Sequence, residues 1–118
     1  MGQLPPCNNV YGLLFSRNSL EKIAEVLRSR LGFTEAEVYV YRSQVDSSEE
    51  LHIKTELYEF DAQKAKEHDT WLLNGCVAGD IAEILSVLKL LSSHLRWAGY
   101  ETKFEIYDEQ FNWIADYP

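Results

Sequence analysis

The sequence has few cysteines and few basic side chains. Its two cysteines, Cys7 and Cys76, lie far apart, and neither belongs to a C-x-x-C pair. Two cysteines are too few for a small disulfide-stapled scaffold, and without a paired motif they do not indicate a zinc or redox site. Only 11 lysines and arginines oppose 19 aspartates and glutamates, which gives a net charge of −8. This balance argues against general nucleic-acid binding and against an anionic membrane surface, because both require clustered cations.

The sequence also contains no long uninterrupted apolar run. The most apolar segment, residues 81–95, is broken by Lys89 and by serines, so it predicts a core helix and not a membrane span. The first ten residues contain two prolines and no basic stretch followed by an apolar one, which argues against a secretory signal. We therefore expect a cytoplasmic protein.

Patterns typical of catalytic or ligand sites are missing too. His52, His68 and His94 are never three or four residues apart, and no H-E-x-x-H motif is present. Gly75 and Gly79 lack the third glycine and the lysine of a phosphate-binding loop. We therefore predict no enzyme, no metal site and no cofactor.

The chain does have enough apolar material for a core. It contains 118 residues, of which 46% are hydrophobic and 13% aromatic. This length and composition predict one folded domain spanning residues 1–118, whose α+β class follows from the elements predicted below.

Two segments have helical periodicity. Apolar residues recur at helical spacing from Leu20 to Leu31, and Gly32 follows as a C-cap. Asn18 with Glu21 predicts a capping box at the start of this helix. A second helix is predicted from residue 81 to near residue 99, with its own capping box formed by Asp80 and Glu83.

The remaining segments favour strands. We predict five of them, at residues 10–15, 38–41, 51–58, 71–78 and 102–107. Residues 61–69 are predicted to form a loop or a frayed helical turn, and the aromatic tail 111–118 is predicted to pack on the body. The order β-α-β-β-β-α-β predicts a two-layer sandwich, in which two helices cover one face of a mostly antiparallel five-stranded sheet. Cys76 is interpreted as a small core residue of its apolar strand.

Aromatic residues alternate with aliphatic ones in these strands. Tyr39, Tyr41 and Tyr58 are predicted to share the sheet face away from the helices, with Tyr107 beside them. Such a face suits a protein partner, because tyrosine and tryptophan anchor interfaces. The alternative is that these are half-exposed tyrosines that serve only strand formation.

The acidic excess is confined to two segments. Residues 46–69 carry a net charge of −5 and residues 100–118 a net charge of −4, whereas the rest of the chain is nearly neutral. If the two segments adjoin in the fold, they form an acidic patch edged by aromatic rings that would steer a basic partner. The predicted partner-binding residues are Glu56, Tyr58, Glu59, Asp61, Glu105, Tyr107, Asp108, Glu109 and Trp113.

The C-terminal third carries a resemblance. A long amphipathic helix running into a strand, from Asp80 to Asp108 and ending in WAGYETKFEIYDE, resembles the immunity proteins of bacterial contact-dependent and related polymorphic toxin systems. The likeness covers size, charge and this segment. It implies a cytosolic, non-catalytic protein that binds and neutralises one cognate toxin domain, often a basic nuclease, its carboxylates taking the place of phosphates in the toxin's cleft.

Two alternatives stay open. One is a small-molecule-binding or regulatory domain that forms a homodimer through its open sheet face. The other is an enzyme that uses His52 or His68 with a carboxylate.

Overall fold

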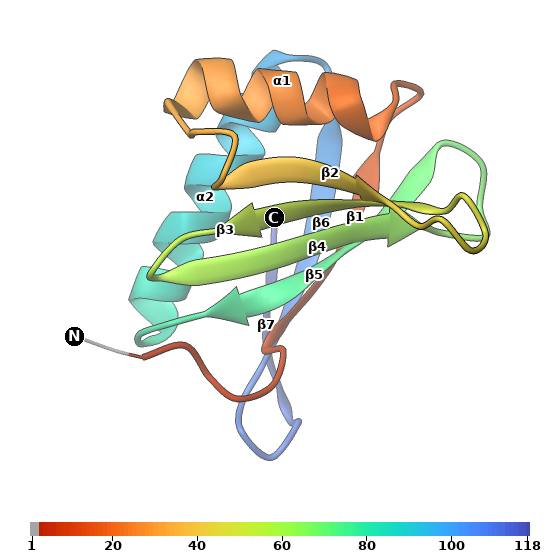
Figure 1. Ribbon diagram of the computed structural model, residues 1–118. Coiled ribbons are helices and arrows are strands. Elements are labelled where there is room, and N and C mark those ends of the chain that lie inside the picture. The colour runs from red at the N-terminus through yellow and green to blue at the C-terminus, as the bar shows by residue number, and fades with distance from the viewer. Residues whose placement is uncertain (1–2) are drawn as a thin grey trace.

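The computed structural model describes residues 3–118, which form an α+β fold with one antiparallel sheet and two helices (Figure 1). The strands are β1 (Val10–Phe15), β2 (Val38–Arg42), β3 (Glu49–Lys54), β4 (Tyr58–Lys64), β5 (Thr70–Val77), β6 (Glu101–Tyr107) and β7 (Trp113–Tyr117). The helices are α1 (Leu20–Leu31) and α2 (Ile81–Trp97). The order across the sheet is β2-β3-β4-β5-β1-β6-β7, with every neighbouring pair antiparallel.

The α+β class is confirmed, but the prediction of five strands is wrong because there are seven. The predicted strand 51–58 is interrupted at Thr55, whose hydroxyl accepts hydrogen bonds from the backbone N–H groups of Leu57 and Tyr58. This side-chain turn ends β3 and lets the chain return as β4. Residues up to Lys64 therefore belong to β4, and the predicted loop 61–69 is reduced to its second half.

The C-terminal tail is also a strand. Residues 113–117 form β7, which pairs with β6 and makes one edge of the sheet. The β6–β7 hairpin projects at the bottom of Figure 1.

The helix predictions are confirmed except for one cap. The Asp80–Glu83 capping box begins α2, and Gly32 ends α1 in the left-handed conformation with φ of 72°. The N-cap of α1 is Ser19 and not Asn18, whose side chain instead donates to the Tyr100 hydroxyl at 2.7 Å.

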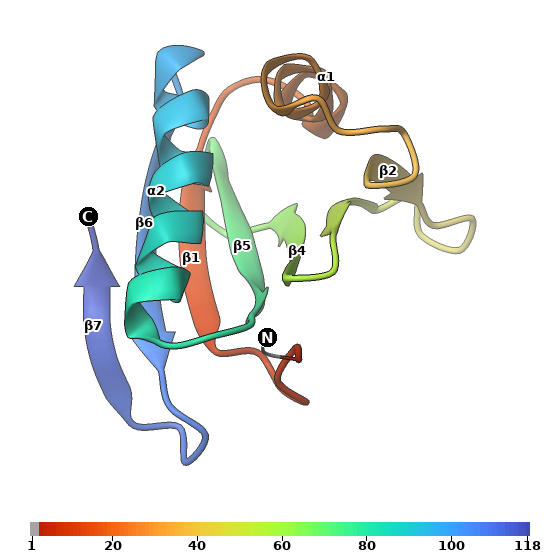
Figure 2. The same cartoon turned by 90° about the vertical axis from the view of Figure 1, so that its left-hand side faces the viewer.

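One core joins both helices to the sheet. Figure 2 shows α2 lying along β6. Two glycines make room in it for large rings: Phe60 lies opposite Gly75, and Phe104 lies opposite Gly12. A Cβ on Gly12 would approach Phe104 Cδ1 to 2.5 Å. The two phenylalanines meet edge to face, with their centroids 6.3 Å apart. Because Gly12 on β1 and Gly75 on β5 have no side chain beyond hydrogen, the two phenylalanine rings can pack at the centre of the sheet.

Candidate functional site

The sheet face opposite the helices, called the open face below, carries one row of side chains that crosses all seven strands. Strand pairing places each member directly opposite the next, because an antiparallel register puts paired side chains on the same face. The row reads Tyr39, His52, Asp61, Asn74, Tyr11, Glu105 and Asp116.

Carboxylates dominate the charge of the open face. The strand positions that face this way include two lysines, Lys54 and Lys103. They also include six carboxylates: Glu50, Glu59, Asp61, Glu101, Glu105 and Asp116. The face that no helix covers therefore carries a net charge of −4 from these strand residues, which is half of the −8 of the whole chain.

The two acidic segments do not adjoin directly. Residues 46–69 supply β3 and β4, residues 100–118 supply β6 and β7, and the strands β5 and β1 lie between them. The middle of the open face carries Asn74 and Tyr11, with Leu13 and Leu72 beside them. The open face thus has acidic residues on β3 and β4 to one side and on β6 and β7 to the other, with a neutral, partly apolar centre on β5 and β1 between them.

A hollow of about 470 Å³ opens over this centre. Its lining combines apolar surface from Tyr11, Leu13 and Leu72 with polar groups from Lys103, Glu105 and other residues. The hollow lies over β5, β1, β6 and β7. Its lining includes two of the carboxylates on the β6–β7 side, Glu105 and Asp116. It can accept an extended group that is apolar along its length and positively charged at its tip.

Three aromatic rings gather at the β6–β7 end of the open face. Tyr11 meets both Tyr107 and Phe111 edge to face, and Tyr107 stacks on Phe111 with centroids 4.6 Å apart. Phe111 has φ of 61°, which bulky residues rarely adopt, and its ring is 63% exposed. Trp113 is 59% exposed on the neighbouring edge strand. The hairpin therefore presents aromatic surface beside the acidic residues.

Most of the predicted partner-binding residues are exposed, and three of the acidic ones, Asp61, Glu105 and Asp108, have structural partners. Glu56 lies in the β3–β4 turn, and Glu59 and Asp61 face outward on β4. Asp61 Oδ1 lies at ion-pair distance from His52 Nδ1, without the angle that a hydrogen bond requires. The His52 ring also stacks on Tyr39, with centroids 5.1 Å apart.

The other predicted acidic residues lie on or near β6. Glu105 accepts a hydrogen bond from the Tyr107 hydroxyl at 3.0 Å, and this bond raises the pKa of Tyr107. Asp108 accepts from the backbone N–H groups of Gln110 and Asn112, so its carboxylate holds the β6–β7 turn. Glu109 is exposed in the same turn.

Tyr58 does not lie on the open face, so this expectation is wrong. Its side chain is 8% exposed and belongs to the core. The turn at Thr55 restarts the alternation, and Tyr58 therefore points to the same side as Phe60. Burial, followed by the charge of Glu37, raises the pKa of the Tyr58 phenol.

Cys76 is the opposite case. The sequence pattern predicts it in the core, but it is partly exposed on the open face, and its thiol contacts Asn8 Oδ1 at 3.3 Å. Register explains the error, because Gly75 occupies the core-facing position of β5 next to it. Partial burial, with Glu59 nearby, raises the pKa of this thiol.

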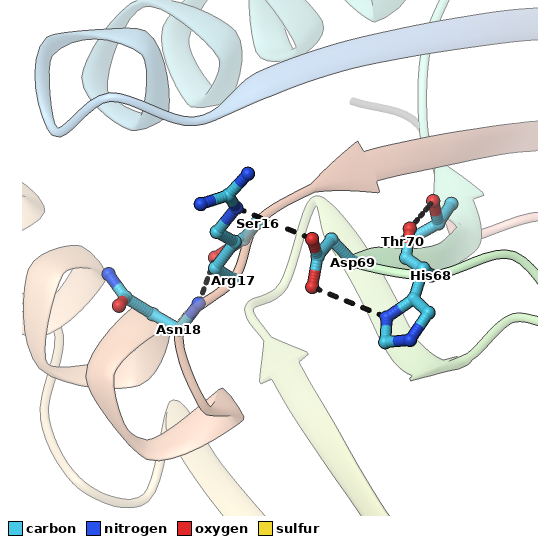
Figure 3. A network of polar contacts seen from close by, with 6 residues as sticks. All are labelled: Ser16, Arg17, Asn18, His68, Asp69 and Thr70. Atoms are coloured by element: carbon cyan, nitrogen blue, oxygen red, sulfur yellow. Dashed lines mark hydrogen bonds and ion pairs between the residues drawn. The ribbon is translucent and has the colours of Figure 1, made fainter.

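A second hollow, of about 530 Å³, lies where the β1–α1, β4–β5 and α2–β6 connections meet. Figure 3 shows its polar network: the Arg17 guanidinium pairs with Asp69 at 3.4 Å, and His68 lies 3.8 Å from the same carboxylate. The Asn18 backbone N–H donates to the Ser16 hydroxyl. The His68 side chain is fully exposed, and Asp69 is engaged by Arg17. The network therefore ties two loops together.

Sequence reasoning missed several open-face residues, notably Tyr11, Asn74, Phe111 and Asp116. The sequence pattern identifies Tyr11 only as part of the strand 10–15 and Asp116 only as part of the tail 111–118. Knowledge of the strand order would have identified both, because β1 pairs with β6, and β6 with β7.

Neither a metal site nor a membrane span is found in residues 3–118. No group of three or more His, Cys, Asp or Glu side chains in this range could hold a metal ion. Neither helix in this range has the length and apolar character needed to cross a membrane. Comparisons with protein-family models, with curated proteins and with solved structures gave no match.

Proposed function

We propose that this chain is a non-catalytic immunity protein that binds and neutralises a basic toxin domain through the open face of its sheet. The observation that carries the proposal is the excess of carboxylates on the open face, six against two lysines. A face of this charge attracts a cationic protein surface and accelerates its association.

The aromatic hairpin supplies the other part of such an interface. Charge steers a partner, but binding energy comes mainly from buried aromatic anchors near the centre of the contact. Phe111 and Trp113 are exposed next to Asp108 and Glu109. A basic partner that covers the hairpin would bury both rings and keep its cations near these carboxylates.

The first candidate for the partner is the protein encoded by the gene immediately upstream. We expect the two chains to co-purify as a stoichiometric complex, and the neighbour alone to be toxic when expressed. A neighbour that lacks a toxin-like domain, together with no saturable binding to a basic protein, would refute the proposal.

Charge reversal then locates the interface. The triple variant Glu59→Lys, Asp61→Lys and Glu105→Lys should slow association with the co-purified partner about tenfold and flatten its dependence on salt. The matched control reverses three exposed carboxylates away from the open face, Glu25, Glu35 and Glu67. If both variants slow association equally, net charge alone explains the effect and the open face is not the interface.

A second function is favoured by the hollow on the open face. Its volume of about 470 Å³ falls in the range of small-molecule sites. A ligand-binding or regulatory domain that forms a homodimer through this face would show a mass that rises with concentration, and a ligand would raise its melting temperature. Light scattering that gives a monomer at every concentration argues against this alternative.

A further inference from the structure

The hollow over β1, β5, β6 and β7 has two carboxylates on one side and apolar surface on the other. Glu105 and Asp116 lie directly opposite each other on β6 and β7. Tyr11, Leu13 and Leu72 supply apolar surface. We call this hollow the groove.

The two carboxylates of the groove are held in position. The Tyr107 hydroxyl donates to Glu105 Oε1 at 3.0 Å, and the Trp113 indole N–H donates to Asp116 Oδ1 at 2.8 Å. Each carboxylate therefore uses one oxygen for a fixed hydrogen bond. The second oxygen of each makes no hydrogen bond to any side chain within residues 3–118.

This pair also lacks a counter-charge. Among residues 3–118, no lysine, arginine or histidine lies within ion-pair distance of either carboxylate. Lys103 lines the same groove, two positions from Glu105 on β6, yet it pairs with neither. Like charges directly opposite on neighbouring strands are destabilising. A cation supplied from outside the chain would relieve this repulsion.

We propose that the groove binds one arginine side chain of the basic partner, with its guanidinium between Glu105 and Asp116. This inference rests on the function proposed above. The aliphatic stem would lie on Leu13 and Leu72, and the Tyr11 ring offers a face for the cation. The planar guanidinium presents several N–H donors in a fixed fork and can serve two carboxylates at once, which the ammonium of lysine does less well.

The groove can be tested without the partner by NMR titration with butylguanidinium, which reproduces an arginine side chain. We expect saturable shifts of the Trp113 indole N–H signal, assigned with the Trp113→Phe variant. Butylurea, which is neutral and similar in shape, should give no saturable shift at the same ionic strength. Butylammonium should bind several-fold more weakly than butylguanidinium.

Two variants make the test specific. The double variant Glu105→Gln and Asp116→Asn keeps an acceptor for Tyr107 and for Trp113, and should weaken butylguanidinium binding at least about tenfold. The control variant Glu25→Gln and Glu35→Gln removes the same charge elsewhere and should bind as the wild type does. A melting curve for each variant establishes that it is folded.

The outcomes separate the two proposals. Equal shifts with butylurea, equal binding of butylammonium, undiminished binding by the double variant or the absence of saturation would each overturn the arginine site. Butylguanidinium binding without capture of any basic protein would support the groove and count against the immunity function. Capture of the partner with unchanged affinity by the double variant would support the immunity function and overturn the arginine site.

Discussion

Glu105 on β6 lies directly opposite Asp116 on β7, and each carboxylate is fixed by a hydrogen bond from an aromatic neighbour. An acidic pair across two strands is unfavourable for folding. Its presence beside a hollow is understandable if the pair serves binding, because sites that bind strongly charged groups are often electrostatically strained when empty.

Replacing Asp116 with asparagine should therefore stabilise the isolated protein. We expect the free energy of unfolding to rise by roughly 0.2 to 1 kcal/mol, because the variant removes a like-charge pair and keeps the acceptor for Trp113. Urea denaturation measures this difference, and the gain should shrink in about 1 M NaCl, which screens the repulsion. A loss of stability at both salt concentrations would show that the pair is not repulsive.

The Asp108 carboxylate should hold the β6–β7 hairpin. It accepts from the backbone N–H groups of Gln110 and Asn112 at 3.0 and 2.8 Å. Asp108→Ala removes both bonds and should cost about 1 to 2 kcal/mol of stability, with faster amide hydrogen exchange in β7. Glu109→Gln in the same turn is the control and should leave both quantities nearly unchanged.

Stability should fall in alkali through the buried phenol of Tyr58. Burial, and then the charge of Glu37, raises its pKa in the folded protein above the unfolded value near 10. The unfolded chain therefore loses this proton at a lower pH than the folded one. The stability that the neutral Tyr58 phenol contributes to the folded protein is fully present below about pH 10, and it is lost as pH rises toward the pKa of the folded state.

Tyr58→Phe should reduce that alkaline loss, as urea denaturation from about pH 8 to about pH 11 would measure. Tyr41→Phe is the matched control, because the Tyr41 ring is 55% exposed on β2. An identical alkaline slope in the wild type and the Tyr58 variant would contradict the prediction.

One buried hydrogen bond ties α2 to β6. The Thr102 hydroxyl donates to the Ser92 hydroxyl at 2.8 Å, and the two residues are 4% and 3% exposed. Ser92→Ala should cost about 1 to 3 kcal/mol, because it leaves the Thr102 hydroxyl buried without its acceptor. Adding Thr102→Val should recover part of that loss. A double-mutant cycle with no coupling energy would rule out this account.

Much of the local structure follows from local signals. The α1 and α2 periodicities, the Gly32 cap and the Asp80–Glu83 capping box are all short-range features, and the structure confirms each of them. The strand expected at residues 38–41 is confirmed as well, as β2, and it pairs with β3. The errors also have local causes. Thr55 turns the chain inside an apparently continuous alternation, and Ser19 caps α1 in place of its neighbour Asn18.

The candidate site was predictable only in part. The location of the acidic excess in residues 46–69 and 100–118 is a property of the sequence and places charge on β3, β4, β6 and β7. The face on which a side chain lies depends on strand register. A single turn can shift the alternation of faces by one residue. Tyr58 lies in the core because the turn at Thr55 restarts the alternation, and Cys76 lies on the open face because its neighbour Gly75 takes the core-facing position.

The sequence by itself determined an acidic α+β domain, its two helices and the segments that carry its charge, because these depend on composition and short-range periodicity. Only the tertiary structure decided that β5 and β1 separate the acidic segments and that Glu105 faces Asp116. Such adjacencies depend on pairing between strands distant in sequence, and periodicity within each strand carries no information about which strand becomes its neighbour.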